Sequence, residues 1–500
     1  MPMRQDDTEI FVNVNPFETR LAIVEAGSLV EFYVERDKDR GITGNIYKGK
    51  VVRVLPGMQS AFVEIGLQRT AFLHVSDIKE SLGDVEEEEE GEGEGEARAR
   101  PSGGPARIQD ILKQGQDIMV QVAKEPMGTK GARVTSYTSL AGRYLVFMPT
   151  YDKVAISRRI SSERERRRLK SIVQSMRAPG HGFIIRTVCE GASGEAVKAD
   201  MDYLVKLWQR ILDRREKAPT PSVLYEELDL TLRILRDVFS ADVKRLVVDS
   251  PEEFKRAKEF MEEFMPRLAG RVELYEGAED VFDAHGIEIE LARALERKVW
   301  LRSGGFLIID QMEALTAVDV NTGKYVGKKS SDQTILKTNL EAVTEAVFQL
   351  RLRNIGGIIV IDFIDMARIS DREKVYNELK DALRADKART NILKISELGI
   401  VEMTRKRVRE SIVQSLCEPC PYCDGNGVVK GRDTIIMDIY RELVRELSGK
   451  KRKATVYCNP YVAERFEEHR AVIEDLEKRF DKRVVIKPVD RFHQERYEIT

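Results

Sequence analysis

Long apolar runs are absent from this 500-residue sequence, and cysteine and histidine are scarce. No stretch approaches the roughly eighteen consecutive apolar residues that a membrane-spanning helix needs, so we expect no membrane span. The first ten residues, MPMRQDDTEI, hold neither a basic segment nor an apolar core, which argues against a secretion signal. We therefore expect a cytoplasmic protein.

Three of the five cysteines lie within residues 417–423, CEPCPYC. This clustering suits a reducing compartment and a metal site better than a disulfide framework. A C-x2-C pair followed by alternating glycines is typical of a zinc knuckle, with Cys420 and Cys423 as ligands; a metal-free turn is the alternative. Because structural zinc prefers four ligands, either Cys417 contributes or two chains share one ion. We expect the shared site, hence a homodimer, and such dimers could pair into tetramers.

Acidic residues are concentrated in one place. Residues 84–96, DVEEEEEGEGEGE, hold nine acids and no base. Without these nine acids, the net charge of −2 becomes +7 for the rest of the chain, so the body of the protein is mildly basic. A run of Glu and Gly cannot form a packed element, and we expect a disordered surface loop there.

Closely spaced short strands are predicted at 8–35, at 44–78 and again after the acidic run, as in a small barrel. The order GKVVRV, AFVEIG, TAFLHVSDI resembles an S1-type RNA-binding domain of the oligonucleotide-binding fold. That resemblance implies base stacking on exposed aromatics, Phe62 and Phe72, with His74 close by and Lys48 attracting the backbone. Packing of both phenylalanines in the barrel core is the alternative.

Two acids and an amide close two later strands. In TAVDVNTGKYVG, residues 316–327, apolar and polar residues alternate, and Asp319 and Asn321 project from one face. Ordinary turn chemistry would explain this ending equally well. An amphipathic helix is predicted at 332–354 and a strand in IIVIDFIDM, residues 358–366. The right-handed crossover of a strand–helix–strand unit makes the two strands parallel, so Asp319 and Asp362 reach one sheet edge.

The apolar run around Asp362 predicts a strand covered on both faces, where an unpaired carboxylate costs several kcal/mol. A cation should therefore compensate this charge. Two carboxylates and an amide oxygen without a nearby His or Cys suit Mg²⁺, although an arginine would compensate the charge as well. Asp365 faces the other side and is expected to have a structural or supporting role.

The segments TAVDVNTG, LEAVTEAVFQLRLRNIGGIIVIDFIDM and CPYCDGNG resemble the ribonuclease E/G family, and the resemblance covers essentially the whole chain. It implies a multidomain α/β fold in which an S1-type OB barrel is inserted in an RNase H-like domain. The implied parts are RNase H-like 1–39 and 232–294, S1-type 40–131 with an acidic loop at 84–104, 5′-sensor 132–231, DNase I-like catalytic 295–416, zinc link 417–430 and a small C-terminal α/β domain 431–500.

The resemblance also implies an activity: a Mg²⁺-dependent endoribonuclease that cuts single-stranded RNA in rRNA maturation and mRNA decay, leaving 5′-phosphate and 3′-hydroxyl ends. Asp319 and Asp362 would hold Mg²⁺, and Asn321 would orient the site or the scissile phosphate. The same resemblance implies a zinc link between two protomers through Cys420 and Cys423.

A pocket that senses the RNA 5′-monophosphate is implied as well, with Arg186 and Thr187 in GFIIRTV, supported by Val146 and Arg389. Arginine offers a bidentate fork to a phosphate dianion, and threonine adds a hydroxyl donor. Lys130 matches a further RNA-contacting position. A non-catalytic RNA-binding or ribosome-associated protein is the alternative, and the S1-type block argues against a DNase.

Overall fold

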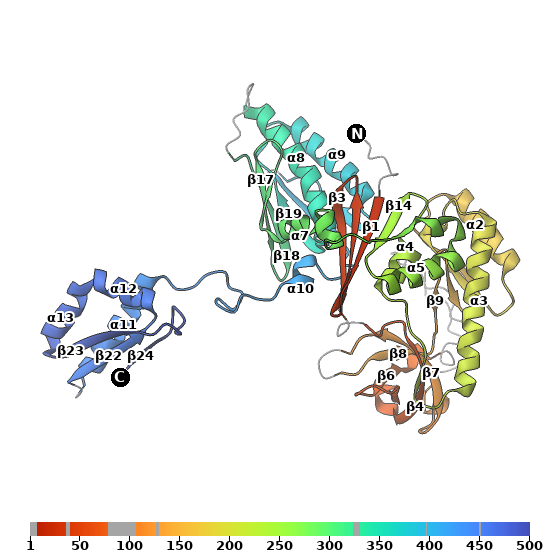
Figure 1. The fold of residues 1–500 in the computed structure, drawn as a ribbon, viewed down its shortest axis with the longest axis horizontal. Helices are drawn as coiled ribbons and strands as arrows, with labels where there is room; N and C mark the ends of the chain where they lie inside the picture. Colours follow the sequence, from red (N-terminus) through yellow and green to blue (C-terminus); the bar gives the residue numbers. More distant parts are fainter. Residues whose placement is uncertain are drawn as a thin grey trace, which may run out of the picture. The chain divides into compact units, whose positions relative to one another are not determined.

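The computed structural model describes residues 8–36, 41–78, 107–126, 130–323, 331–396, 398–449 and 452–500. The chain forms two compact units, Met1–Ile412 and Val413–Thr500, coloured along the sequence in Figure 1. The acidic run 84–96 lies outside the described residues. Within the described ranges, no helix combines the length and apolar character needed to cross a membrane.

Segments far apart in the sequence share the first sheet of the larger unit. The short strands that the pattern of residues 8–35 predicts are β1, β2 and β3, which form an antiparallel meander, and β14 pairs with β1 in parallel (Figure 1). Leucines and aromatics of α4 and α5 fill the core against this sheet. The elements are β1 Thr8–Val14, β2 Glu18–Glu25, β3 Ser28–Arg36, α4 Leu230–Asp237, β14 Val243–Val248, α5 Pro251–Phe264, β15 Val272–Leu274, α6 Val281–Ala284 and α7 Ile287–Leu295.

A small barrel follows β3, as predicted. Its strand order is β13-β4-β5-β6-β8-β7, and an additional β4–β7 pairing closes the barrel. Gly49 on β4 allows β5 to approach closely, because a Cβ there would lie 2.7 Å from Val63 Cγ1 and 2.8 Å from the Glu64 carbonyl oxygen. The elements are β4 Ile46–Leu55, β5 Ser60–Glu64, β6 Ala71–His74, α1 Ile108–Ile111, β7 Asp117–Lys124, β8 Arg133–Thr135 and β13 Ser222–Tyr225.

A four-stranded sheet of order β11-β12-β10-β9 carries two helices. Leu169 and Val173 form the buried stripe of α2, the amphipathic helix that the basic run around residue 166 predicts. Asp200 on α3 accepts hydrogen bonds from three successive backbone N–H groups, 143 to 145, at 2.9–3.0 Å, and so ties α3 to the β9–β10 turn. The elements are β9 Leu140–Ala141, β10 Leu145–Met148, β11 Val154–Ile156, α2 Glu163–Met176, β12 Gly182–Ile185 and α3 Gly194–Lys217.

The last sheet of the larger unit has the order β16-β17-β18-β19-β21-β20. Helices α8 and α9 pack on one face of it. The expectation that β19 is covered on both faces is wrong, because Ile359 and Ile361 are fully buried while Ile358, on the other face, is 52% exposed. The elements are β16 Lys298–Trp300, β17 Phe306–Gln311, β18 Leu315–Asn321, α8 Ser331–Leu352, β19 Gly357–Asp362, α9 Ile369–Ala382, β20 Thr390–Ile392, β21 Ile400–Arg405 and α10 Ile412–Leu416.

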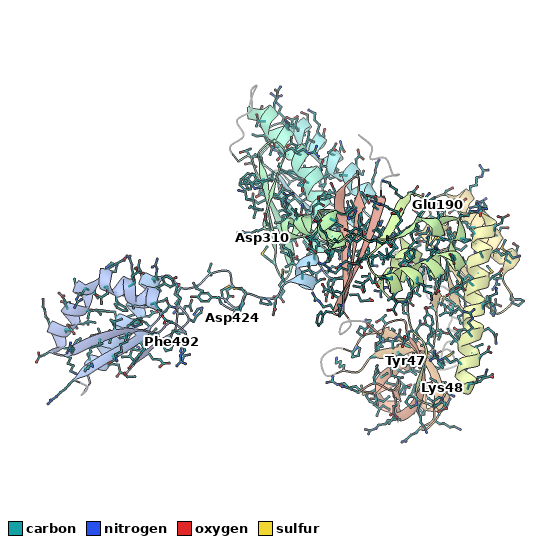
Figure 2. All side chains as sticks on the ribbon, viewed as in Figure 1. Tyr47, Lys48, Glu190, Asp310, Asp424 and Phe492 are labelled. Atoms are coloured by element: carbon teal, nitrogen blue, oxygen red, sulfur yellow. The ribbon has the colours of Figure 1, made fainter. Side chains whose placement is uncertain are left out.

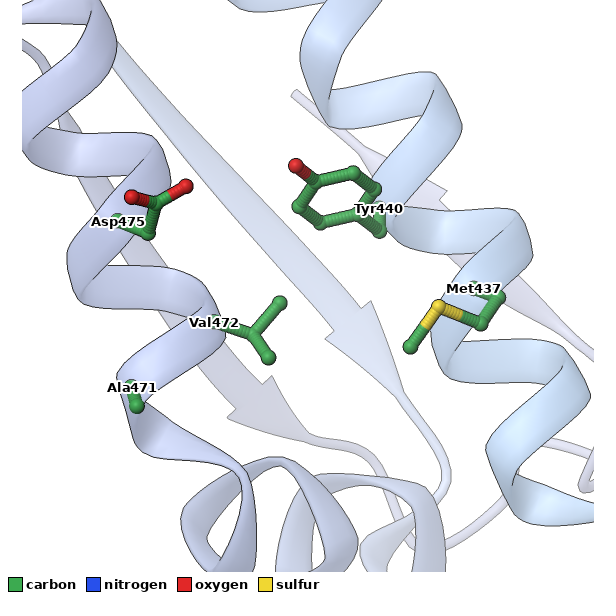
Figure 3. Close-up of a pocket in the computed structure, with 5 residues that line it drawn as sticks. All are labelled: Met437, Tyr440, Ala471, Val472 and Asp475. Atoms are coloured by element: carbon green, nitrogen blue, oxygen red, sulfur yellow. The ribbon is translucent and has the colours of Figure 1, made fainter.

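The smaller unit is an α/β fold with strand order β23-β22-β24. A shallow pocket of about 410 Å³ lies between α11 and α13 (Figure 3). Of its five lining residues, only Tyr440 and Asp475 can ionise, so this pocket holds no set of catalytic groups. The elements are α11 Arg432–Leu447, β22 Lys453–Cys458, α12 Pro460–Glu468, α13 Arg470–Phe480, β23 Arg483–Pro488 and β24 Tyr497–Ile499.

A buried ion pair joins β21 to the turn before β20. Arg405 donates from Nε to Asp386 Oδ2 at 2.6 Å and from Nη2 to Oδ1 at 3.0 Å, and the two side chains are only 5% and 2% exposed. A third donor of Arg405 reaches the Ile355 carbonyl oxygen at 2.9 Å. The pair thereby fixes the end of the sheet to the segment that carries Arg389.

Replacing Asp386 with Ala should lower the free energy of unfolding of the larger unit by roughly 3–5 kcal/mol, because Arg405 would remain charged and buried without its partner. The matched control is Asp310→Ala, which breaks an ion pair with Arg297 at the surface of the same sheet. Its loss should cost less than about 1 kcal/mol. Urea denaturation followed by circular dichroism measures both, and equal costs would contradict the assigned role of Asp386.

Candidate active site and nucleic-acid interface

Asp319 and Asp362 lie directly opposite each other. Strands β18 and β19 pair in parallel, with these two residues in register at the ends of the strands, as the crossover predicts. The Asn321 amide donates from Nδ2 to Asp319 Oδ2 at 2.9 Å, so the amide holds one carboxylate in orientation. The chain thus brings two acids and an amide oxygen to one sheet edge.

The surroundings of Asp362 differ from the expectation of a buried, compensated charge. Both acids are exposed, because the sheet is uncovered on their side, and within the described residues neither forms an ion pair. Partial burial and the negative charges of Asp319 and Asp365 raise the pKa of Asp362. This edge therefore has an uncompensated negative charge that would attract a cation.

Asn339 was missed by the sequence analysis, although it positions the loop after β19. This fully buried side chain of α8 donates from Nδ2 to the Ile364 carbonyl oxygen at 2.8 Å and accepts from the Ile364 N–H at 3.1 Å. Both backbone groups lie between Asp362 and Asp365. A single Asn inside an amphipathic helix was the available signal, but helical spacing alone does not reveal its partner.

The carboxylates at this edge suit Mg²⁺ better than they suit an ion that protein ligands must enclose completely. Across the described residues, no group of three or more His, Cys, Asp or Glu side chains is arranged to hold a metal. Mg²⁺ keeps several of its waters and is commonly held by one or two carboxylates. Asp319 and Asp362, which are register partners at the sheet edge, match that requirement.

Phe62 and Phe72 face outward from the barrel. They are register partners on β5 and β6, with ring centroids 6.1 Å apart at 66°, and both are half-buried and absent from the barrel core. Lys130, which is exposed, comes two residues before Ala132, whose carbonyl oxygen accepts a hydrogen bond from the Phe72 N–H at 2.7 Å. The alternative that both rings belong to the core is therefore wrong.

Lys48 has a different role from the one expected. Tyr47 and Lys48 are neighbours on β4 (Figure 2); the tyrosine belongs to the barrel core, and the lysine is half-buried. The Lys48 ammonium donates to the carbonyl oxygens of Arg215 and Ala218 at 3.0 and 2.8 Å. It therefore caps the end of α3. His74 Nδ1 lies 2.8 Å from Ser76 Oγ and helps to shape the turn after β6.

The four 5′-sensing candidates come from two parts of the larger unit. Val146 on β10 pairs with Ile184 on β12, two residues before Arg186. Thr187 Oγ1 lies 3.0 Å from Ser157 Oγ. Arg389 is exposed, and its segment contacts the turn after β11, where Arg159 Nη1 donates to the Lys387 carbonyl oxygen at 3.2 Å.

The guanidinium of Arg186 is already engaged. It pairs with Asp237 at 2.7 Å and donates to the Gly142 carbonyl oxygen. Burial alone would raise the pKa of Asp237, but Arg236 and Arg186 lower it, which keeps the carboxylate ionised. Sequence analysis could not identify Asp237, because 51 residues separate it from Arg186.

Cys420 and Cys423 lie on a tight turn of the smaller unit. The Gly427 N–H donates to Cys423 Sγ at 3.2 Å, and the backbone passes through positive φ at Asp424, labelled in Figure 2. Hydrogen bonds from the backbone at residues 423 and 422 and from the Cys423 side chain lower the pKa of Cys420, which favours the thiolate that metals bind. Cys417 is exposed.

The two other cysteines are buried in separate cores. Burial raises the pKa of Cys189 to about 12 and that of Cys458 to about 11. Both thiols therefore stay protonated and are poor metal ligands.

An oligonucleotide-binding barrel joined to a two-carboxylate edge defines a multidomain enzyme that acts on RNA. Residues 139–408 match the ribonuclease E/G family, residues 42–135 match the S1 RNA-binding domain, and residues 419–500 match the thioredoxin-like domain of RNase E/G. The chain belongs to the ribonuclease E/G family.

Curated relatives extend the match to nearly the full length. The chain is 45% identical to ribonuclease G of Haemophilus influenzae over 497 residues, 99% of both chains. It is 45% identical to ribonuclease G of Escherichia coli K12 over 496 residues, 98% of this chain and 99% of the relative. Identity to E. coli K12 ribonuclease E is 35% over 489 residues, which are 96% of this chain but 45% of that relative. The protein is an RNA-binding endoribonuclease of RNA processing, which sets the non-catalytic alternative aside.

Proposed function

We propose that the protein is a Mg²⁺-dependent endoribonuclease specific for single-stranded RNA, acting at the edge formed by Asp319, Asp362 and Asn321. The register of β18 and β19 is the observation that carries this proposal, because it places two exposed carboxylates side by side. Partial burial and repulsion from Asp319 raise the pKa of Asp362, and a divalent cation would relieve that repulsion. rRNA maturation and mRNA decay are the proposed pathways.

In this mechanism Asp319 and Asp362 would hold Mg²⁺, directly or through its waters, while Asn321 keeps Asp319 oriented. When bound, the ion would act as a Lewis acid beside the phosphate and would lower the pKa of a water that it binds. Asn339 fixes the backbone between Asp362 and Asp365, which limits movement of the edge. Attack by water, with no use of the RNA 2′-hydroxyl, leaves 5′-phosphate and 3′-hydroxyl ends.

Single-strand specificity is assigned to the barrel. Phe62 and Phe72 present half-buried rings on one face, and the exposed Lys130, two residues before the residue that accepts the hydrogen bond of the Phe72 N–H, would add a positive charge. Unpaired bases can stack on such rings, whereas bases inside a duplex are already stacked on each other. The barrel would therefore select and hold an unpaired segment.

The 5′-monophosphate is proposed to bind Arg186 and Thr187, with Val146 and Arg389 beside them. The ion pair with Asp237 supports a competitive arrangement. A phosphate dianion would displace the Asp237 carboxylate from the Arg186 guanidinium, or share the guanidinium with it. A dianion offers more charge to the fork than one carboxylate does.

The fold is proposed to divide as the family resemblance implies. The sheet formed by β1–β3 with β14 and β15 supports an RNase H-like domain of residues 1–39 and 232–294, interrupted by the barrel, 40–131, and the sensor, 132–231. The six-stranded sheet supports a DNase I-like catalytic domain at 295–416. A zinc link at 417–430 and a small domain at 431–500 complete the division.

Two chains are proposed to share one zinc through Cys420 and Cys423 of each. The low pKa of Cys420 and the positive-φ turn support metal binding, and one chain offers only two thiolates on this turn. Tetrahedral structural zinc requires four ligands, which a two-fold axis would supply.

Asp319→Asn and Asp362→Asn should each abolish cleavage of a labelled A/U-rich RNA while leaving RNA binding, measured by fluorescence anisotropy, nearly unchanged. Asp310→Asn, which changes an acid on the adjacent strand, is the matched control and should retain activity. Cleavage by the unchanged protein should rise as pH increases through the raised pKa of Asp362, because only the ionised carboxylate binds metal. More than a few per cent of wild-type turnover at saturating Mg²⁺ in either acid variant would refute the assignment.

Arg186→Ala should reduce the preference for 5′-monophosphorylated over 5′-hydroxyl RNA, because the phosphate loses its charged fork. Cleavage rates on one RNA with each 5′ end measure this ratio. Arg164→Ala, an exposed arginine on α2, is the control. An equal loss on both substrates would point to damaged general RNA binding instead.

Purified protein should contain about half a zinc per chain by elemental analysis, since two chains share each ion. Cys420→Ser should lose both the zinc and the dimer, seen by analytical ultracentrifugation, whereas Cys417→Ser should keep both. One full zinc per monomeric chain would refute sharing and bring Cys417 into the ligand set.

A further inference from the structure

The uncovered face of the six-stranded sheet carries more than the two acids. Asp319 pairs with Ile308 and Asn321 with Phe306 across β18 and β17. On the next strand, Lys298 lies opposite Ile308 and Trp300 opposite Phe306. Because cross-strand partners project from the same side of a sheet, Trp300, Phe306 and Lys298 share the face of the acids.

Trp300, which is exposed, and Phe306, which is half-buried, form an aromatic pair on this face. Their ring centroids are 5.5 Å apart at 65°, and Lys298 Nζ lies 3.9 Å from the indole centroid and 3.8 Å from the phenyl centroid. Trp300 is 63% exposed, although its neighbour Val299 packs toward the core. Cation–π contact accounts for the position of the lysine. It does not account for a large apolar ring left in water.

The pair is close enough to the acids to act on the same substrate. Trp300, Phe306 and Asn321 lie in one row across three neighbouring strands, so the strand of Trp300 is about 10 Å from that of Asn321, two inter-strand spacings. A strand of RNA with one phosphate at Asp319 and Asp362 can place an adjoining nucleotide over the indole.

We propose that Trp300, supported by Phe306 and Lys298, stacks an unpaired nucleobase of the RNA next to the phosphodiester held at Asp319 and Asp362. This proposal rests on the proposed function of the two acids. Stacking on an aromatic face accepts any base, and the lysine adds attraction for the phosphate backbone. The platform therefore positions the scissile bond with little sequence preference, separately from the aromatic pair of the barrel.

Tryptophan fluorescence tests the contact directly, because the chain has only two tryptophans, Trp208 and Trp300. In the Trp208→Phe, Asp319→Asn protein, a short single-stranded RNA should quench the emission of Trp300, and a fully paired RNA of the same length should not. Absence of quenching at RNA concentrations that saturate binding by anisotropy would overturn the proposal.

Cleavage by the otherwise unchanged protein supplies the second measurement. Trp300→Ala should raise KM about tenfold, the usual effect of one lost stacked base, and spread the cleavage positions on one RNA, while Trp300→Phe should retain both. Ile358→Ala, another exposed apolar residue of the same face, is the matched control and should leave both unchanged. Because Trp300 is exposed, the melting temperature of the Ala variant should not fall. Unchanged KM and cleavage positions in Trp300→Ala would overturn the platform.

The two proposals fail in distinguishable ways. If Asp319→Asn still cleaves RNA, the assignment of the metal site is wrong. Quenching of Trp300 would still demonstrate the contact between this residue and the RNA. If the face is instead covered by a second copy of this chain, Trp300→Ala and Ile358→Ala would both reduce the oligomeric mass and RNA would not quench Trp300. That outcome overturns the platform and leaves the assignment of the acids intact.

Discussion

The parallel pairing of β18 and β19 is the constraint on which the candidate active site depends. Parallel neighbours need a long connection, and α8, Ser331–Leu352, provides it. Buried residues of α8, including Ala342, Val343 and Leu350, belong to the same hydrophobic core as Val318 and Ile359 of the two strands. This apolar packing holds two negative charges together at the sheet edge, so the core offsets a repulsion that the site itself cannot relieve without a cation.

Polar groups at the proposed binding sites are already engaged within the chain. Asn321 binds Asp319, and Arg186 binds Asp237. These contacts orient side chains before a ligand arrives, which reduces the conformational entropy lost on binding. At the proposed sensor, a 5′-phosphate would have to compete with the Asp237 carboxylate, which would favour a phosphate dianion over weaker hydrogen-bond acceptors.

Two features of a single chain are incomplete by themselves. The knuckle offers two thiolates where zinc requires four ligands, and the sheet leaves one face, with Trp300 and Ile358, in water. We propose that a second protomer completes the first and that RNA covers the second. Exposed thiols and large exposed apolar side chains are features of surfaces to which another molecule binds.

Local patterns in the sequence determined the barrel strands, the α8 crossover and the meeting of Asp319 with Asp362, because period-2 alternation and the handedness of crossovers act over short distances. The apolar run around Asp362 led to the wrong expectation that both faces of β19 are covered, because a strand rich in Ile and Val does not reveal whether its second face is covered. Lys48 could not be assigned to the end of α3, nor Asp237 to Arg186, because such partners lie far apart in sequence. Asn339 and the row from Trp300 to Asn321 likewise arise only when strands and helix pack together. The sequence alone determined which elements form. Tertiary packing decided which of their side chains are buried, which are paired and which remain exposed at the proposed RNA-binding surfaces.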